Sequence, residues 1–323
     1  GALNQNYSNL QPMADSGFSV ISMSGLLGAV ANKSMTARYM AVKTVWQEFC
    51  GIRNHANFQV HTRYRLDDKG GFKKVAPNGE LKHSSLGETS FTNRLDTYGT
   101  MMTLNRQQQY NDDLGAFTAI PDLMGFNSAT RLEEAVHVLL LSNPSSFYST
   151  TNKNYLNTTA SALSISAVTT AEKTFLDQVN SNGKPIGADP VIMLVPNALS
   201  SLANSIFANE KVNETTTTDK KSTNDNPHKG KYRPVTSRYL GNTNITDQDG
   251  AAITGQSSTG WYLFCDPSVM ASIGVAFLNG QQMPTIESGE TDFNTLGMSW
   301  RAYHDWGVGM EDPAASQWNK GIS

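Results

Sequence analysis

The feature that most constrains the fold is the stretch from Tyr98 to Ser142, an apolar strand that leads into one long helix. Apolar side chains recur there every three or four residues, which places them on one helix face. Asn111, Asp112 and Asp113 can cap the helix start, because their oxygens accept hydrogen bonds from free backbone N–H groups. Pro121 removes one helical hydrogen bond, so we expect a kink nearby. The rest of the chain must pack along this rod of roughly 40 Å.

Composition narrows the class of protein. With 323 residues, 38% of them hydrophobic, the chain can bury a core, and its net charge of −3 argues against a tight nucleic-acid binder. No apolar run reaches the roughly 18 residues that span a bilayer, so we expect no membrane partner. Cys50 and Cys265 lie far apart without metal-ligand spacing, which favours two buried thiols. The first residue is Gly1 rather than Met, and Gly1-Ala2-Leu3 has neither the basic start nor the apolar core of a signal peptide, so we expect either a maturation cleavage or a vector remnant.

The first third of the chain predicts an arm, a helix and a projecting hairpin. Residues 1–18 are polar and predict an extended arm, and 34–49 has helical spacing. Residues 58–66 alternate between apolar and polar side chains, as a strand with one solvated face does. The segment 57–104 holds too few large apolar residues for a core of its own. It should therefore project from the body and find a partner elsewhere.

The second half predicts a mixed α/β region. We expect a helix at 168–179 that a left-handed Gly183 closes, buried strands at 190–196 and 261–265, and a helix at 197–209. Residues 210–231 are rich in Thr, Lys, Asp and Asn. Such a segment buries little apolar area, so we expect a mobile surface loop that the fold does not need.

Two candidate ligand sites are weak. The glycine spacing of 250–257 is that of a phosphate-binding loop, but Gln256 stands where the Lys that neutralises phosphate belongs. His55 and His61 are six residues apart on an expected strand and would face one side, yet no third metal ligand is evident. A plain Gly-rich loop and solvated histidines are the favoured interpretations.

Catalysis is also disfavoured. His304 and Asp305 could belong to a triad, but no serine stands in a nucleophile-elbow pattern. Asp112 and Asp113 could be an acid–base pair, although carboxylates at a helix start cap more often than they catalyse. We therefore predict no catalytic, cofactor or metal site, no cofactor, and no enzymatic activity. A chain of this kind is suited to contacts between copies.

The projecting segment carries cations, although the whole chain is acidic. We expect these cations to contact acidic patches on an adjacent subunit, each exposed pair contributing about 0.2 to 1 kcal/mol. The candidate inter-subunit contact residues are Arg63, Arg65, Lys73, Lys74 and Lys82.

Several segments resemble one known family in order along the chain. They are Pro77 to Lys82; Tyr98-Gly99 with Thr103, Arg106 and Asn111 to Phe117, then Ile120-Pro121 and Gly125; Gly183 to Ile186 with Leu194 to Pro196; Trp261 to Phe264 with Asp266-Pro267; and Phe293 to Gly297 with Tyr303 to Val308 and Lys320-Gly321. In these segments the chain resembles major capsid proteins of tailed phages with the HK97-like fold, especially the Mu-like major head subunit and its fusions to a prohead protease.

The resemblance implies an α+β, HK97-like capsid fold. It implies an N-terminal arm and helix (1–56), an extended E-loop hairpin (57–104), a P-domain with a long spine helix (105–160), an A-domain with a central mixed sheet (161–269), and return strands of the P-domain (270–323). It also makes a trimmed N-terminus unsurprising, because a prohead protease processes this family.

The function that the resemblance implies is a structural major capsid protein. Such a protein self-assembles as pentamers and hexamers into an icosahedral phage head that encloses double-stranded DNA, held on the inner face without sequence specificity. Scaffold, prohead protease, portal and decoration proteins are the implied partners, and the location is the virion, after assembly in the bacterial host cytoplasm. An encapsulin-like compartment shell and a stand-alone hydrolase using His304 and Asp305 stay as alternatives.

Overall fold

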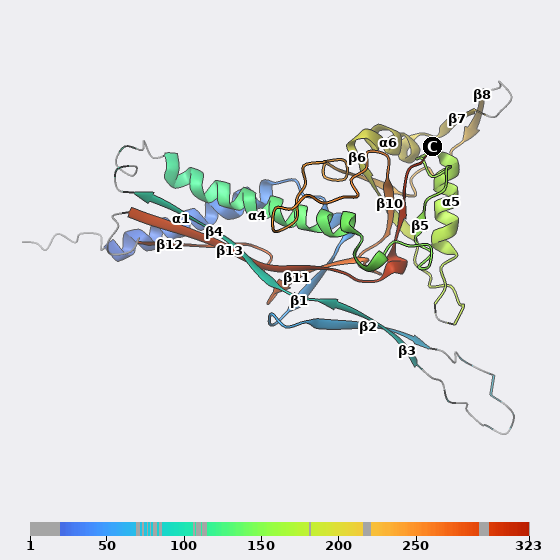
Figure 1. Ribbon diagram of the computed structural model, residues 1–323, viewed down its shortest axis with the longest axis horizontal. Coiled ribbons are helices and arrows are strands. Elements are labelled where there is room, and N and C mark those ends of the chain that lie inside the picture. Colours follow the sequence, from blue (N-terminus) through green and yellow to red (C-terminus); the bar gives the residue numbers. More distant parts are fainter. Residues whose placement is uncertain are drawn as a thin grey trace, which may run out of the picture. The chain divides into compact units, whose positions relative to one another are not determined.

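The computed structural model describes residues 20–68, 86–105, 115–180, 182–215, 221–290 and 297–322, together with the single residues 72, 74, 75, 77, 79, 83, 107 and 111 (Figure 1). The chain divides into two compact units. Unit 1 comprises residues 1–42, 99–128 and 283–304, and unit 2 comprises 43–98, 129–282 and 305–323. Each unit is described by itself below.

Unit 1 is built on two helices and part of a sheet. It contains α1 (Val20–Ala41), the first half of α4 (Gly115–Ser142), β12 (Thr285–Glu290), and the adjoining parts of β4 (Asp96–Asn105) and β13 (Gly297–Met310). Strand β12 pairs antiparallel with β13. Gly125 lets α1 and α4 approach closely, because a Cβ atom there would lie 2.3 Å from the carbonyl oxygen of Met35. The core of this unit consists of Ala31, Met35, Met124, Ile286, Trp300 and Ala302.

Unit 2 contains a mixed sheet in the order β5-β14-β10-β6-β9. Its strands are β5 (Tyr155–Leu156), β6 (Pro190–Pro196), β9 (Arg233–Ser237), β10 (Trp261–Cys265) and β14 (Ser316–Asn319). Successive residues of β10 enter two different clusters: Tyr262 and Phe264 pack with α4, and Leu263 packs with α5 (Ile165–Leu176) and α6 (Ser200–Ala208). Both faces of the sheet are thus covered, which is why β6 and β10 are almost continuously apolar.

A second group of strands completes unit 2. Strand β1 (Gly51–His55) runs parallel to β11 (Ile273–Leu278), which pairs antiparallel with the end of β13. Two ribbons are separate from these sheets: β2 (His61–Asp68) with β3 (Leu86–Asn93), and β7 (Lys211–Thr215) with β8 (Lys221–Asp225). The short elements are α2 (Trp46–Phe49), η1 (Pro144–Ser146), η2 (Asn197–Leu199) and η3 (Pro313–Ala315).

Several sequence predictions are confirmed. Strands β6 and β10 occupy their expected residues, the region 197–209 is helical, and 61–68 forms a strand. Cys50 and Cys265 are free, buried thiols.

None of the described helices combines the length and the apolar character needed to cross a membrane.

Others need correction. The helix expected at 34–49 is α1, which begins at Val20 and ends at Ala41, followed by the short α2. The long helix itself was predicted correctly as α4, which includes Pro121; the kink expected there stays a prediction, and the expected caps Asp112 and Asp113 lie outside the described residues. Helix α5 ends at Leu176, so Gly183, with φ of +73°, serves a later turn rather than a helix cap. Local patterns located these helices better than they located their ends, which tertiary contacts decide.

The largest correction concerns residues 210–231, expected to be a mobile loop. Strands β7 and β8 pair there, from Lys211 with Asp225 to Thr215 with Lys221. Beyond the hairpin, the side chains of Asn226 and His228 are buried. The polar composition did not predict this structure, because hydrogen bonds rather than buried apolar area hold the hairpin and the two buried side chains that follow it.

Candidate interaction surface

The β2–β3 hairpin has two faces, since successive strand residues point to opposite sides. Arg63 pairs with Phe91 and Arg65 with Thr89, so these side chains share one face. Along β3, the residues of this face are partly buried and the alternate ones are exposed. The hairpin therefore turns one face toward the body of unit 2 and one toward solvent.

The inward face is held by two carboxylates that follow β13. Arg53 of β1 donates to Glu311 through Nε at 2.8 Å and Nη2 at 2.6 Å, a two-point contact. Arg63 lies 3.7 Å from the same carboxylate, and Arg65 donates to Asp312. The Glu311 side chain is only 9% exposed. Three cations of β1 and β2 thus converge on one acidic pair.

The backbone of β11 leaves room for this cluster because it has a glycine there. Gly274 of β11 lies beside Glu311, and a Cβ atom at this position would be 2.2 Å from Glu311 Oε1. Asn93 of β3 donates through Nδ2 to the Gly274 carbonyl oxygen at 3.1 Å. The base of the hairpin is therefore fixed through both strands, β3 to β11 and β2 to the carboxylates that follow β13.

The geometry does not test the expected inter-subunit contact, but it shows that two of its five cations, Arg63 and Arg65, have ion-pair partners within their own chain. Lys74 is exposed, and Lys73 and Lys82 lie outside the described residues. Sequence reasoning missed Glu311 and Asp312, because nothing local distinguishes them from other acidic residues. A contact of these five cations with a second copy stays a prediction.

The outward face exposes three large apolar side chains beside polar ones, since Tyr64 pairs with Ser90 and Leu66 with Glu88. Tyr64 and Leu66 of β2 are 58% and 63% exposed, and Leu86 of β3 is 68% exposed. Leu86 pairs with Asp68 across the ribbon and so belongs to the same face as Tyr64 and Leu66. Large exposed apolar side chains that share one face mark a surface for another protein.

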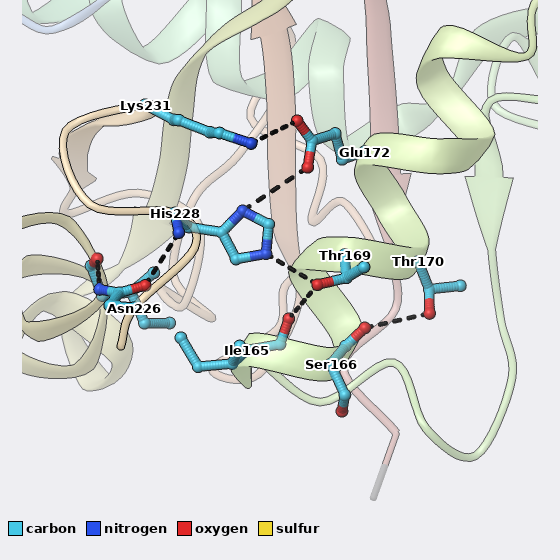
Figure 2. Close-up of polar contacts among 9 residues, drawn as sticks. Ile165, Ser166, Thr169, Thr170, Glu172, Asn226, His228 and Lys231 are labelled. Atoms are coloured by element: carbon cyan, nitrogen blue, oxygen red, sulfur yellow. Dashed lines mark hydrogen bonds and ion pairs between the residues drawn. The ribbon is translucent and has the colours of Figure 1, made fainter. Parts of the chain in front are cut away.

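The β7–β8 hairpin has its own anchor, shown in Figure 2. Asn226 donates through Nδ2 to the carbonyl oxygens of Ile206 at 2.6 Å and Asn209 at 2.8 Å. Its Oδ1 accepts the backbone N–H of His228 at 2.9 Å. One buried amide therefore joins the end of α6 to the chain that leaves the hairpin.

His228 continues this anchor to α5. Its Nε2 lies 2.8 Å from Thr169 Oγ1, and the Thr169 hydroxyl donates to the Ile165 carbonyl oxygen at 3.0 Å. The hydroxyl can therefore only accept from His228, which makes Nε2 the protonated nitrogen. Nδ1 faces the Glu172 carboxylate at 3.6 Å, and Lys231 Nζ is 3.0 Å from Glu172 (Figure 2). Burial lowers the pKa of His228, although Glu172 opposes this.

The residues considered for catalysis do not form a triad. His304 Nδ1 lies 3.2 Å from Ser128 Oγ, but Asp305 accepts instead from Thr97 Oγ1 at 2.6 Å. As neighbours on β13, His304 and Asp305 point to opposite faces. Asp305 is therefore not placed to orient His304 for nucleophilic catalysis.

The ligand candidates from the sequence also have structural roles. His55 and His61 lie on consecutive strands, with their rings stacked 4.0 Å apart, so the single strand expected for them was wrong. Within the described ranges no three His, Cys, Asp or Glu residues are grouped as metal ligands. Gly250 and Gly255 have φ of +82° and +107°, as turns in a glycine-rich loop require.

Comparison with known proteins gives one family and a set of solved structures. The family model described as phage capsid protein matches residues 88–319. The capsid of cyanophage P-SCSP1u has a TM-score of 0.57 at 13% identity, covering 85% of this chain and 87% of that one. The mature capsid of bacteriophage PhiM1 gives 0.54 at 10% identity, with 86% of each chain covered. Mycobacterium phage Patience gives 0.52 at 11% identity, covering 92% and 87%. No curated protein matches.

Proposed function

This chain belongs to the phage capsid protein family, and from that premise we propose that copies of it assemble as pentamers and hexamers into an icosahedral phage head. It is a structural major capsid protein with a mixed α+β, HK97-like fold, and its place is the capsid of the virion. The head would enclose double-stranded DNA, held on the inner face without sequence specificity. Its role is structural rather than catalytic.

One observation supports assembly most directly, namely the outward face of the β2–β3 hairpin. Tyr64, Leu66 and Leu86 are each more than half exposed, although β2 is held to the residues after β13 through the pairs Arg65–Asp312 and Arg63–Glu311. A ribbon held at its base, with large apolar side chains uncovered on one face, suits the surface of a neighbouring subunit. We assign this surface to the E-loop, in addition to the contact expected of its cations.

The division into segments follows from the same family. We propose an N-terminal arm and helix at 1–56, the E-loop at 57–104, the P-domain at 105–160, the A-domain at 161–269 and return strands at 270–323. The A-domain then contains three strands of the five-stranded mixed sheet, β6, β9 and β10, with helices α5 and α6, whereas β5 and β14 fall in the neighbouring segments. Scaffold, prohead protease, portal and decoration proteins are the partners we propose, with assembly in the bacterial host cytoplasm.

Electron microscopy of the purified chain tests this function. Under assembly conditions, with any scaffold supplied, we expect capsomers and closed shells. The double variant Tyr64→Ser/Leu66→Ser should unfold at the same temperature as the wild-type subunit but fail to form shells. Val269→Ser, which removes an apolar side chain 72% exposed elsewhere, is the matched control and should assemble. A strict monomer under every condition would refute the proposal, and normal shells from the double variant would remove the hairpin face from it.

A further inference from the structure

Unit 2 has a pocket of about 240 Å³ whose lining includes Lys43, Glu133, Asn197, Thr236 and Arg238. Sites for drug-sized ligands are usually roughly 300 to 1,000 Å³, so this pocket suits a smaller molecule. The residues come from four separate parts of the chain: the segment before α2, α4, the start of η2, and the end of β9. A bound molecule would therefore connect elements that are distant in sequence.

The pocket lies where two parallel strands end. Strands β6 and β9 are parallel neighbours, with Val195 opposite Thr236. Asn197 follows the last residue of β6, and Thr236 is next to last in β9. In open α/β sheets, ligands bind outside the carboxyl ends of parallel strands, particularly where a helix begins after the strand. Here η2 follows β6 directly and continues into α6, without a side chain that caps its first turn.

The charges around the pocket favour an anion. Lys43 and Arg238 are exposed, and neither makes an ion pair with any residue that the structure describes. Lys43 and Arg238 thus place two cations at one pocket of a chain whose net charge is −3.

Glu133 is the carboxyl group of the pocket, and it is already engaged. Its Oε2 accepts the backbone N–H groups of Val45 at 3.0 Å and Trp46 at 3.1 Å. Burial raises the pKa of Glu133 to about 7, despite these two hydrogen bonds. Near neutral pH the group is therefore partly uncharged, and its protonated form would not repel an anion.

The other titratable groups near Glu133 do not change their protonation state near neutral pH. Burial lowers the pKa of His137 to about 4, and burial raises the pKa values of Cys50 and Tyr239. These three groups therefore remain neutral between about pH 6 and pH 8. A change in anion affinity over this range would therefore report on Glu133.

We propose that this pocket is a binding site for a small tetrahedral oxyanion of the phosphate or sulfate class, held between Lys43 and Arg238 at the carboxyl ends of β6 and β9. Neither the assembly proposed above nor the family assignment requires such a site. An oxyanion here would join the segment before α2 to the end of the central sheet.

Equilibrium dialysis of the full chain against radiolabelled sulfate tests this proposal, with chloride holding the ionic strength constant. Sulfate keeps two charges between about pH 6 and pH 8, so only the protein titrates. Lys43→Met and Arg238→Met should each weaken binding about tenfold, because each removes a charge-assisted contact. Lys184→Met, at an exposed lysine outside the pocket, should bind as the wild type does. Inorganic phosphate should displace the sulfate.

The pH dependence of sulfate affinity is tested with the variant Glu133→Gln. The wild type should bind sulfate more tightly at about pH 6 than at pH 8, and this variant should bind equally at both. Circular dichroism would verify that each variant is folded. Binding that survives in the Lys43→Met/Arg238→Met double variant, or that Lys184→Met weakens equally, would overturn the proposal. So would a wild type that binds no sulfate.

Discussion

The acidic pair at the base of the β2–β3 hairpin allows a graded test, because the partners of Glu311 differ in burial. The change is Glu311→Gln, which keeps the side-chain shape and removes the charge. Arg53, 22% exposed, loses a two-point contact, while Arg63, 53% exposed, loses a partner at 3.7 Å. The two arginines should therefore account for very different shares of the loss.

The magnitude follows from this exposure. A hydrogen bond to a charged group contributes about 1.5 to 3 kcal/mol, and the Arg53 contact is shielded enough to lie in that range. The Arg63 pair is largely solvated, so screening reduces its contribution to about 0.5 kcal/mol or less. We expect Glu311→Gln to lower the free energy of unfolding by about 2 to 3 kcal/mol and Arg63→Gln by about 0.5 kcal/mol.

Urea unfolding of unassembled subunits measures these differences, and hydrogen exchange locates them. Glu311→Gln should increase exchange at the β1 amides more than at those of β6 and β10, because Arg53 lies on β1. Glu287→Gln is the matched control, because its partner Arg301 is 68% exposed and the pair is a surface contact. Equal losses from Glu287→Gln and Glu311→Gln would refute the reasoning. An unchanged subunit in the Arg53→Gln variant would refute it too.

Two further predictions concern buried titratable groups. The pKa of the Glu133 carboxyl is 4.5 in the unfolded chain and about 7 in the fold, so the wild type should lose stability relative to Glu133→Gln as pH rises through this interval. The loss should be on the order of 3 kcal/mol in urea titrations at several pH values, and a constant difference would contradict this. Burial lowers the pKa of His228, so acidification below about pH 6.5 should destabilise the wild type more than His228→Gln. Hydrogen exchange should show that loss first in β7 and β8, and exchange there that does not depend on pH would count against the anchor.

Local sequence determined the elements whose signal is short-range. The alternation at 58–66 predicts a two-faced strand, the apolar runs at 190–196 and 261–265 predict buried strands, and the spacing after 115 predicts the long helix. These patterns follow from periods of 2 and 3.6 residues, which a few neighbouring residues are enough to display. The resemblance, carried by segments in order, indicated the family that the comparison then gave for residues 88–319.

Tertiary structure alone decided which polar groups meet. Arg65 and Asp312 are 247 residues apart, and Arg53 and Glu311 are 258 apart, so no local pattern distinguishes these pairs from solvated charges. The same holds for Asn226 and His228, whose polar segment suggested a loop until α5 and α6 supplied partners. Gly125 resembles a weak point in a helix, yet it permits the contact with Met35. Each of these roles depends on atoms that only folding brings together, whereas the periodicity of a strand or helix is present in the chain before it folds.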